Sequence, residues 1–550
     1  MLNRRDFVKT VAASAATATY GLHAAQPDAG RSYDLVVYGG TASGVMTAVS
    51  AARQGLKVAL LEPWRHVGGM VTGGLSRTDV GRREVIGGMA LEFYMRLGRR
   101  YNMMRHLHNV AWLPEPHVAE SVLLEMLAGA NVPVFHGHQL REKDGVVKSG
   151  GRIRSIVMTN GAGFTAAVFA DCSYEGDLMA QAGVSYTIGR EPISQYGESL
   201  AGIRAETPKH QFRVDVPAVD RNGNLYPEIS PEPKGKPGDG DKRVQAYNFR
   251  VIATDDPNLR VPWPQPEGYD PKRYELLALM LEAEYKRLGD KLTFNEMVGI
   301  GRIPNRKADF NNKGAFSTDY IGKNYDYPDG GYARRKEIWD DHVRYVQGFF
   351  FFLANDPRVP KILQYEARQW GLSRDEFEDN GYWPHQLYIR EGRRMIGAYV
   401  MKQKDLQTDL TKPDVIGMGS YNSDSHNVQR FKNEKGFAEN EGDVQVAVKP
   451  YQIPYRVMLP KPEECLNLLV PVCLSASHVA YSSIRMEPQY MLIGHAAGVA
   501  AKLAIAANKP VHEINVKQLQ TTLLDEGGVF EYNPIPQWSA IGKLAPKLND

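Results

Sequence analysis

The stretch that decides the fold runs from residue 33 to residue 44 and reads YDLVVYGGTASG. Its first six residues are apolar enough for a short buried parallel strand, and a glycine-rich turn follows at once. Residues 45–54 then carry a helical pattern of small side chains, with Gly55 where a helix typically ends. A second apolar run, residues 57–61, ends at Glu62. The order strand, turn, helix, strand and acid predicts a βαβ unit that binds a dinucleotide.

The residue types in this unit each have a physical role. Gly39 permits the tight turn, and Gly44 lets the helix pack against the strand. Ser43 lies beside it at the helix N-terminus, which offers unpaired N–H groups and partial positive charge to a pyrophosphate. Glu62, 23 positions after Gly39, can accept hydrogen bonds from ribose hydroxyls. Thr41 stands where a glycine is usual, and we expect its hydroxyl to donate to a phosphate oxygen.

Composition excludes several other classes of protein. The 550 residues are 43% hydrophobic and 23% charged, which excludes a disordered or fibrous chain. With 66 basic and 63 acidic residues the net charge is +3, so we expect no nucleic-acid partner. Cys172, Cys465 and Cys473 are too few and too widely spaced for a disulfide framework, a zinc site or an iron–sulfur cluster, and no metal is expected. No apolar run reaches 18 residues, so we expect no integral membrane segment.

The N-terminus carries a pattern typical of an export signal. Residues 3–9 read NRRDFVK, and an Ala/Thr-rich, weakly apolar stretch follows over residues 10–25. This segment is similar to the twin-arginine signal, from which Asn3 and Val8 depart conservatively. The resemblance implies recognition by the twin-arginine export machinery, export in the folded state with cofactor already inserted, and a periplasmic or secreted location. An ordinary basic N-terminus with an Ala-rich tail is the alternative.

A second glycine-rich loop identifies the dinucleotide. Residues 68–75 read GGMVTGGL and begin after five residues that follow Glu62. Here the chain resembles the FAD-dependent oxidoreductases of the two-dinucleotide-binding-domain superfamily, in the branch related to fumarate-reductase and heterodisulfide-reductase flavoprotein subunits. The resemblance implies FAD as the cofactor, with the backbone of Gly68, Gly69 and Met70 close to its flavin end.

Three further segments carry the same resemblance. Residues 131–140 resemble the strand whose backbone meets the adenine. Residues 171–178, DCSYEGDL, resemble an acidic segment of the family, with Tyr174 in place of a glycine. Residues 482–488, SSIRMEP, resemble the opening of the C-terminal helix that points at the flavin pyrimidine. The resemblance implies cofactor contacts at Leu140, Asp177, Arg485 and Met486.

The predicted fold class is α/β, with a Rossmann-like FAD-binding domain split by an inserted α+β substrate domain. A parallel sheet and a β-meander, over residues 153–157 and 166–169, form the FAD-binding domain. The Rossmann pattern is absent from the middle of the chain, where helices are predicted over residues 334–354 and 383–401. In order, we expect a twin-arginine-type signal peptide (1–30), the N-terminal part of the FAD-binding domain (31–188), a substrate or cap domain (189–445) and the C-terminal part of the FAD-binding domain (446–550).

Catalytic candidates follow from the chemistry of flavin reduction. Hydride transfer to flavin N5 needs a base for the hydroxyl proton of the substrate, and histidine suits that role near neutrality. Arginine can orient a carboxylate or stabilise an oxyanion. The candidates are His426 in a polar loop, His385 and Arg394 in the segment from residue 383, and His478 before the C-terminal flavin segment. The alternatives are a salt bridge on a solvated face for Arg394 and ordinary hydrogen-bonded roles for His385 and His478.

Together these features predict an exported FAD-dependent oxidoreductase. It would transfer a hydride from a polar organic substrate, a carbohydrate or a hydroxy acid, to flavin N5 and then pass electrons to an acceptor that the sequence does not identify. One alternative is a redox-neutral glycan lyase or hydrolase that uses FAD transiently or structurally. Another is a non-catalytic flavin-carrying binding protein. Net reduction of the flavin by substrate separates the first reading from the other two.

Overall fold

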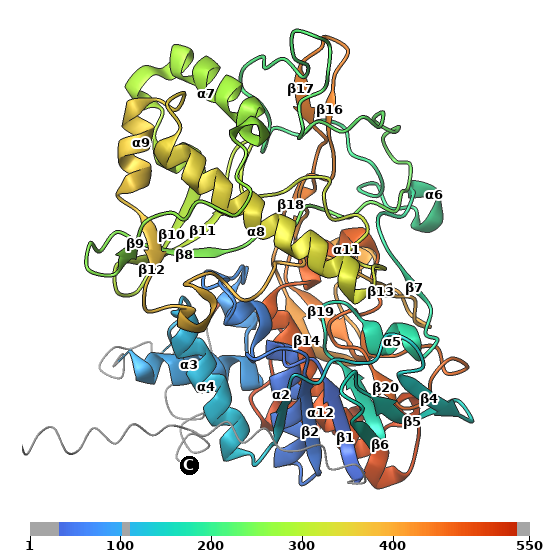
Figure 1. The fold of residues 1–550 in the computed structure, drawn as a ribbon. Coiled ribbons are helices and arrows are strands. Elements are labelled where there is room, and N and C mark those ends of the chain that lie inside the picture. The colour runs from blue at the N-terminus through green and yellow to red at the C-terminus, as the bar shows by residue number, and fades with distance from the viewer. Residues whose placement is uncertain (1–31, 102–109, 536–550) are drawn as a thin grey trace, which may run out of the picture.

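A seven-stranded sheet forms the base of the molecule in the computed structural model, which describes residues 32–101 and 110–535 (Figure 1). The strand order is β3-β2-β1-β6-β5-β4, with β20 beside β6. The parallel strands are β1 (Ser32–Tyr38), β2 (Val58–Glu62), β3 (Val134–His136), β6 (Gly163–Asp171) and β20 (Leu468–Leu469). The antiparallel strands β4 (Val146–Ser149) and β5 (Arg152–Val157) extend the sheet from β6, which confirms the predicted meander. The predicted signal peptide lies outside the described residues.

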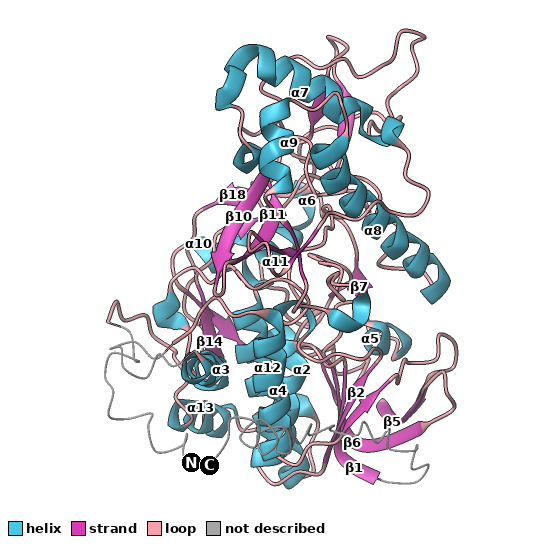
Figure 2. Cartoon of the chain, turned by 60° about the vertical axis from the view of Figure 1, so that its left-hand side comes forward, coloured by secondary structure: helices cyan, strands magenta, loops and turns pink. Residues whose placement is uncertain are grey.

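Two helices run parallel to each other against this sheet and meet through glycines (Figures 1 and 2). They are α2 (Ala42–Arg53) and α12 (Glu487–Ala507). A Cβ atom on Gly494 would lie 2.3 Å from the carbonyl oxygen of Ser43, and one on Gly498 would lie 2.6 Å from that of Thr47. The contacts advance in the same direction along both helices, so the helices are parallel. Because α2 begins just after the carboxyl end of β1, both N-termini point toward the carboxyl ends of the parallel strands. Since α12 begins seven residues before Gly494, it extends about 10 Å beyond the start of α2.

Helix α12 is also the one helix among the described residues that is long and apolar enough to cross a membrane. Within its most apolar window, 72% of the residues are buried inside the protein. It therefore has the surroundings of a core helix, and it implies no integral membrane segment.

A second, antiparallel sheet lies above the first, in the order β10-β11-β8-β12-β9. Its strands are β8 (Val251–Thr254), β9 (Arg260–Val261), β10 (Val298–Ile303), β11 (Lys307–Asn312) and β12 (Gly371–Ser373). Helices α7 (Glu275–Leu288), α8 (Tyr332–Asn355) and α9 (Lys361–Arg368) accompany it, and α8 confirms the helix predicted over residues 334–354. Residues 186–187 pair with residues 394–395, and residues 415–419 pair with residues 451–454, so strand pairs join both sides of the expected domain boundaries. The boundaries themselves stay predictions.

The remaining elements are shorter or peripheral. The other helices are α3 (Gly88–Arg100), α4 (Pro116–Gly129), α5 (Asp177–Gln181), α6 (Ile193–Tyr196), α10 (Gln403–Gln407), α11 (His478–Ile484) and α13 (Val516–Asp525). The other strands are β7 (Tyr186–Thr187), β13 (Arg394–Met395), β14 (Val415–Gly419), β15 (Ser423–Asp424), β16 (Arg430–Lys432), β17 (Ala438–Asn440), β18 (Gln445–Val446) and β19 (Tyr451–Pro454).

The helix predicted over residues 383–401 is wrong. This segment contains no helix, and β13 is its one strand. Leu387 and Ile389 pack in the hydrophobic core, whereas the hydroxyl of Tyr388 and the guanidinium of Arg390 contact buried charged groups, which gives the segment an alternation of two residues. An extended chain satisfies that alternation and a helix cannot, because successive side chains of a strand point to opposite sides.

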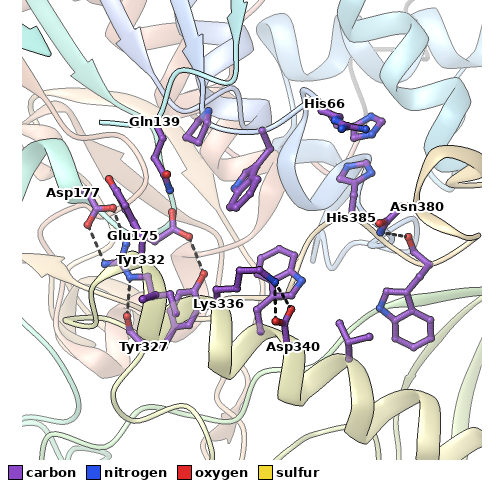
Figure 3. Close-up of a pocket in the computed structure, with 18 of the residues that line it drawn as sticks. His66, Gln139, Glu175, Asp177, Tyr327, Tyr332, Lys336, Asp340, Asn380 and His385 are labelled. Atoms are coloured by element: carbon purple, nitrogen blue, oxygen red, sulfur yellow. Dashed lines mark hydrogen bonds and ion pairs between the residues drawn. The ribbon is translucent and has the colours of Figure 1, made fainter. Parts of the chain in front are cut away.

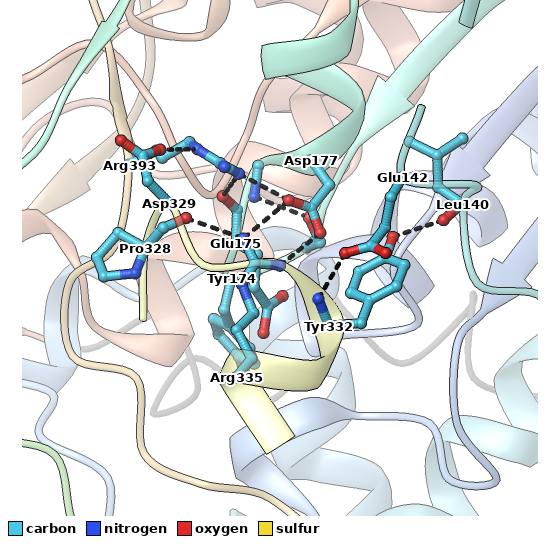
Figure 4. A network of polar contacts seen from close by, with 12 residues as sticks. Leu140, Glu142, Tyr174, Glu175, Asp177, Pro328, Asp329, Tyr332, Arg335 and Arg393 are labelled. Carbon is cyan, nitrogen blue, oxygen red and sulfur yellow. Dashed lines mark hydrogen bonds and ion pairs between the residues drawn. The ribbon is translucent and has the colours of Figure 1, made fainter. Parts of the chain in front are cut away.

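The N-terminus of α8 is fixed onto the carboxyl ends of the sheet strands by a network of polar contacts (Figure 4). Arg335 makes a bidentate ion pair with Asp177, at 2.7 and 2.9 Å, and Arg393 binds the same carboxylate at 2.7 Å. The Tyr332 hydroxyl donates to the carbonyl oxygen of Leu140 at 2.6 Å. Burial alone would raise the pKa of Asp177, but the contacts with Arg335 and Arg393 together outweigh burial, and the pKa is lowered. Asp177 thus anchors α8 to the sheet.

Replacing Gly498 by valine should destabilise the protein by about 1–3 kcal/mol, because the new side chain must push α2 and α12 apart. The urea midpoint of unfolding measures the effect. Gly129→Ala in α4 is the matched control, since a Cβ there has no atom within 4 Å. Equal midpoints for the two variants would show that the close helix contact is not needed.

Arg335→Met should cost about 3–5 kcal/mol of unfolding free energy near neutral pH, because it leaves the buried Asp177 carboxylate short of its main partner. The neighbouring exposed Arg334→Met is the control and should change stability by less than about 0.5 kcal/mol. The folded-state pKa of Asp177 lies below its unfolded value, so this contribution exists above the unfolded pKa and is lost as pH falls through the folded one. The gap between wild type and Arg335→Met should therefore shrink below about pH 4. A gap that persists in acid would contradict the assignment.

Candidate functional site

Gly39 and Gly44, at the turn between β1 and α2, have no room for a side chain. Gly39 has φ +94°, and a Cβ on it would lie 2.6 Å from the backbone nitrogen of Ser173. A Cβ on Gly44 would lie 2.0 Å from the carbonyl oxygen of Gly39. At the end of β2, the Glu62 carboxylate accepts hydrogen bonds from the backbone N–H groups of Gly40, at 2.7 Å, and Trp64, at 2.8 Å. Burial raises the pKa of Glu62 to about 7.

Thr41 differs from its predicted role. Its hydroxyl donates to the carbonyl oxygen of Cys172 at 2.7 Å and accepts from the backbone N–H of Gly44 at 3.2 Å, which caps α2. The hydroxyl is therefore not free to donate to a phosphate oxygen as predicted. What remains for a pyrophosphate is the backbone of the first turn of α2 and the buried Oγ of Ser43, which has no hydrogen-bond partner among the described residues.

The second glycine loop is joined to the N-terminus of α12 through Tyr174. The Gly68 N–H donates to a carbonyl of the first glycine turn at 2.6 Å. The Met70 N–H donates to the Tyr174 hydroxyl at 2.9 Å, and that hydroxyl donates to Glu487 Oε1 at 2.7 Å. A Cβ on Gly69 would lie 2.5 Å from the Tyr174 hydroxyl oxygen. The tyrosine that replaces a glycine thus joins the loop to α12.

Two polar groups at the start of α12 have no hydrogen-bond partner among the described residues. They are the side-chain amide of Gln489, which is fully buried, and Oε2 of Glu487. Burial raises the pKa of Glu487 to about 8, so it carries a proton at neutral pH. Met486 occupies the N-cap position of the same helix. Orphaned buried polar atoms beside two helix N-termini and a glycine cradle fit a bound dinucleotide, and these residues would hold FAD.

The backbone of Leu140 has protein partners in place of the expected adenine. Its N–H donates to the Tyr38 hydroxyl at 3.1 Å, and its carbonyl accepts from Tyr332. Asp177 is likewise occupied by Arg335 and Arg393. Both residues lie at the predicted edge of the sheet but serve to hold α8 there.

A cavity of about 840 Å³ lies between this edge and α8 (Figure 3). His385, one of the predicted catalytic residues, lies on its wall and stacks on His66 with ring centroids 4.1 Å apart. Neither ring nitrogen of His385 has a partner in the described part of the chain. Burial lowers the pKa of His385 to about 3, so its imidazole is neutral.

His426 lies in a buried charged group, the His426 cluster, which consists of Asp319, Arg390, Asp424, His426 and Arg485. His426 Nδ1 lies 2.6 Å from Asp319 Oδ2, and Arg390 pairs with the other oxygen of Asp319 at 2.8 Å. Arg485 donates to the Asp424 carbonyl at 2.8 Å. Burial and then Arg390 lower the pKa of His426 to about 3. Burial would raise the pKa of Asp319, but Arg390 and His426 lower it to about 2. The pair is therefore a carboxylate and a neutral imidazole at neutral pH.

His478 and Arg394 belong to a second buried group, the His478 cluster, with Glu191 and Glu391. His478 Nδ1 lies 2.8 Å from Glu391, and its backbone N–H donates to Glu191 at 2.9 Å. Arg394 pairs with Glu191 at 2.7 Å and also with Glu391. Arg394 is fully buried, so the alternative of a solvated face is wrong for it. Every charged member is paired, which is the arrangement expected of a structural network.

Gln245 connects the two clusters. Its side-chain Nε2 donates to Glu391 at 2.7 Å, and its side-chain Oε1 accepts from the backbone N–H of His426 at 3.1 Å. The structure thus brings His426, Arg485, His478 and Arg394 into one buried polar region. His385 lies apart, on the cavity.

Sequence reasoning missed Asp319, the residue that orients His426. The two are 107 positions apart, and no motif spacing links them. Tyr388 was also missed; its hydroxyl accepts from Arg485 at 3.0 Å. Both residues come close to their partners only through the folding of distant segments, so no local sequence signal identifies either of them.

The solved structures that are similar to this chain match it over only part of its length. No curated protein matches the chain. Among solved structures, the anhydrotetracycline hydroxylase OxyS of Streptomyces rimosus is similar over 33% of this chain and 41% of its own, with 15% identity and a TM-score of 0.23. A flavin-containing monooxygenase of Stenotrophomonas maltophilia is similar over 32% of this chain and 45% of its own, with 18% identity and a TM-score of 0.19. Thioredoxin reductase of T. acidophilum is similar over 26% of this chain and 35% of its own, with 20% identity and a TM-score of 0.16. The matched part spans less than half the length of each of these chains.

The family comparison covers far more of the sequence. The family model described as FAD dependent oxidoreductase matches residues 34–523, which include the glycine turn, the second glycine loop and nearly all of α13. The match begins in β1, runs through α8 and ends in α13. The protein is a member of the FAD-dependent oxidoreductase family.

Proposed function

We propose that this enzyme oxidises a polar organic substrate bearing a hydroxyl group, a carbohydrate or a hydroxy acid, with His426 as the general base. FAD, when bound, supplies flavin N5 as the hydride acceptor. The observation that supports the proposal most is the 2.6 Å contact between His426 Nδ1 and Asp319 in a buried, arginine-containing cluster.

The Asp319 carboxylate can only accept a hydrogen bond, so it holds the Nδ1–H tautomer of His426. Nε2 is then left with its lone pair and can take the proton of a substrate hydroxyl. The negative charge of Asp319 favours the imidazolium that forms. It offsets part of the effect of burial and of Arg390, which together lower the pKa of His426 to about 3. The carboxylate acts here as an orienting partner and keeps its own charge.

The two arginines of the His426 cluster suit a substrate with several oxygens. Arg390 Nε and Arg485 Nε are buried and have no hydrogen-bond partner among the described residues. Buried guanidinium N–H groups are costly to leave unpaired, and a hydroxyl, an alkoxide or a carboxylate satisfies them. They would hold the substrate oxygen in place while His426 removes its proton.

Replacing His426 by glutamine should slow substrate-dependent reduction of the flavin by about 10²- to 10⁴-fold, the usual contribution of a general base. The measurement is anaerobic bleaching of the bound flavin with a panel of sugars and hydroxy acids. His117→Gln is the control, because that imidazole is half exposed and pairs with Glu376, which is not a member of the His426 cluster. If the His426→Gln variant binds FAD and its flavin is reduced at the wild-type rate, His426 is not the general base.

The same experiment separates the proposal from its alternatives. Product formation from a glycan without net bleaching would indicate a redox-neutral lyase or hydrolase. Binding of a ligand with neither product formation nor bleaching of the flavin would indicate a flavin-carrying binding protein. The family membership favours neither of these.

We also propose export of the folded protein through the twin-arginine machinery to the periplasm or beyond. The support is the sequence NRRDFVK at residues 3–9, which lies outside the described structure. Replacing Arg4 and Arg5 together by lysine should leave the protein in the cytoplasm, as cell fractionation would measure, whereas Lys9→Arg should not. Equal export of wild type and the double variant would contradict the proposal.

A further inference from the structure

The accessible part of the His426 cluster consists of two neighbouring acceptors. The side chains of His426 and Asp424 keep 11% and 12% of their surface exposed, whereas the other three members keep 5% or less. His426 Nε2 lies 3.7 Å from Asp424 Oδ2, which is too far for a hydrogen bond. A molecule that enters the cluster therefore meets these two atoms first.

When Asp424 is ionised, neither atom has a hydrogen to offer the other. Nε2 carries a lone pair, since Nδ1–H of the same ring points at Asp319. Pairing of β15 with β18 places Gln445 beside Asp424, and its Nε2 donates to Asp424 Oδ1 at 2.6 Å. Oδ2 is left on the side of His426 and Arg485. The two acceptors suit a ligand that brings two donors at adjacent positions.

We infer that His426 and Asp424 bind two hydroxyl groups on neighbouring carbons, so that the substrate is a neutral vicinal diol of the carbohydrate type. Each hydroxyl donates to one of the two acceptors. The inference rests on the proposed function and narrows its substrate from two classes to one. In the oxidation, the carbon beside His426 loses a hydride to FAD and its hydroxyl loses a proton to Nε2. The product is a hydroxy ketone whose remaining hydroxyl stays at Asp424.

The charge of the cluster favours a diol over a hydroxy acid. Its two carboxylates and two guanidiniums cancel, and His426 is neutral, so the net charge is zero. Each guanidinium already has a carboxylate, since Arg390 lies 2.8 Å from Asp319 and Arg485 lies 3.4 Å from Asp424. The carboxylate of a hydroxy acid would add a buried charge without a counter-charge, which is costly. An ammonium group would do so with the opposite sign, whereas a hydroxyl adds no charge.

The groups around Asp424 add negative charge rather than positive. Burial is the largest cause of the raised pKa of Asp424, about 7, and Arg485 opposes it. Asp79 and Asp443 raise this pKa further, whereas Arg390 lowers it. Both outer carboxylates would therefore repel a substrate carboxylate at Asp424. At about pH 8 Asp424 is ionised and acts as an acceptor, so the tests are made there.

The first test is anaerobic bleaching of the bound flavin by neutral polyols and sugars (glycerol, inositol, glucose, galactose) and by hydroxy acids (glycolate, lactate, malate, mandelate). At least one neutral compound should reduce the flavin, and every hydroxy acid should do so roughly tenfold more slowly or worse. Faster reduction by a hydroxy acid than by every neutral compound would overturn the inference and leave the proposed oxidation intact. No reduction by any compound would instead refute the proposed function.

The second test removes one hydroxyl from the best substrate and one carboxylate from the protein. The deoxy analogue that lacks the neighbouring hydroxyl should have kcat/KM lower by roughly 10- to 150-fold, as loss of a hydrogen bond to a charged group predicts. Asp424→Asn should lower kcat/KM for the intact substrate by a similar factor, because Gln445 holds the remaining carbonyl oxygen and the amide N–H₂ faces the diol. In that variant, removal of the hydroxyl should cost nothing more.

Glu439→Gln in β17 is the matched control, because this carboxylate is mostly buried, pairs with Lys234 and is not a member of the His426 cluster. It should leave kcat/KM unchanged for both compounds. The deoxy comparison in the wild type tests the inference even if Asp424→Asn fails to fold. Equal kcat/KM for the substrate and its deoxy analogue would overturn the inference. So would additive effects of the two changes, since they would show that Asp424 does not contact that hydroxyl.

Discussion

The contact between α2 and α12 sets the geometry of the whole site. Because Gly494 and Gly498 have no side chains, the two helices approach to backbone contact and run parallel. Each N-terminus carries a partial positive charge of about half an elementary charge, and both are directed at one edge of the sheet. The glycine turn near residue 40 and the start of α12 near residue 490, which the resemblance assigns to the flavin, therefore meet at one edge of the sheet, although almost the entire described chain separates them.

A second constraint is the burial of charge around that site. The segment from Trp383 to Arg394 runs along the cavity, the His426 cluster and the His478 cluster in turn. Buried ion pairs are weak sources of stability, since desolvation cancels much of their attraction. Their value here is a set of fixed dipoles and charges in a dry region, which need not reorganise when charge develops during a reaction. Every charged member of the His478 cluster has a partner, whereas the His426 cluster retains donors that are unpaired within the described part of the chain. This difference separates scaffold from candidate active site.

The local parts of this architecture were predictable from the sequence, and the long-range parts were not. The βαβ unit around Gly39, the meander, α8 and α12 follow from hydrophobic period and glycine placement, which act over a few residues. The prediction of a helix from residue 383 fails because the apolar and charged side chains of this segment find their packing and ion-pair partners in distant parts of the chain. Thr41 and Leu140 fit the family pattern in sequence, but their hydrogen bonds go to Cys172, Tyr38 and Tyr332. His426 was found as a polar loop residue, but Asp319, which gives it a defined tautomer, becomes visible only in the fold.

The most direct test of these conclusions is the quantity and identity of flavin that the purified chain releases on heat denaturation, with no flavin added during purification. The glycine cradle and the two helix N-termini predict one FAD per chain. Release of FMN, or a folded protein that carries no flavin and takes up none when FAD is supplied, would contradict the site as it is described here.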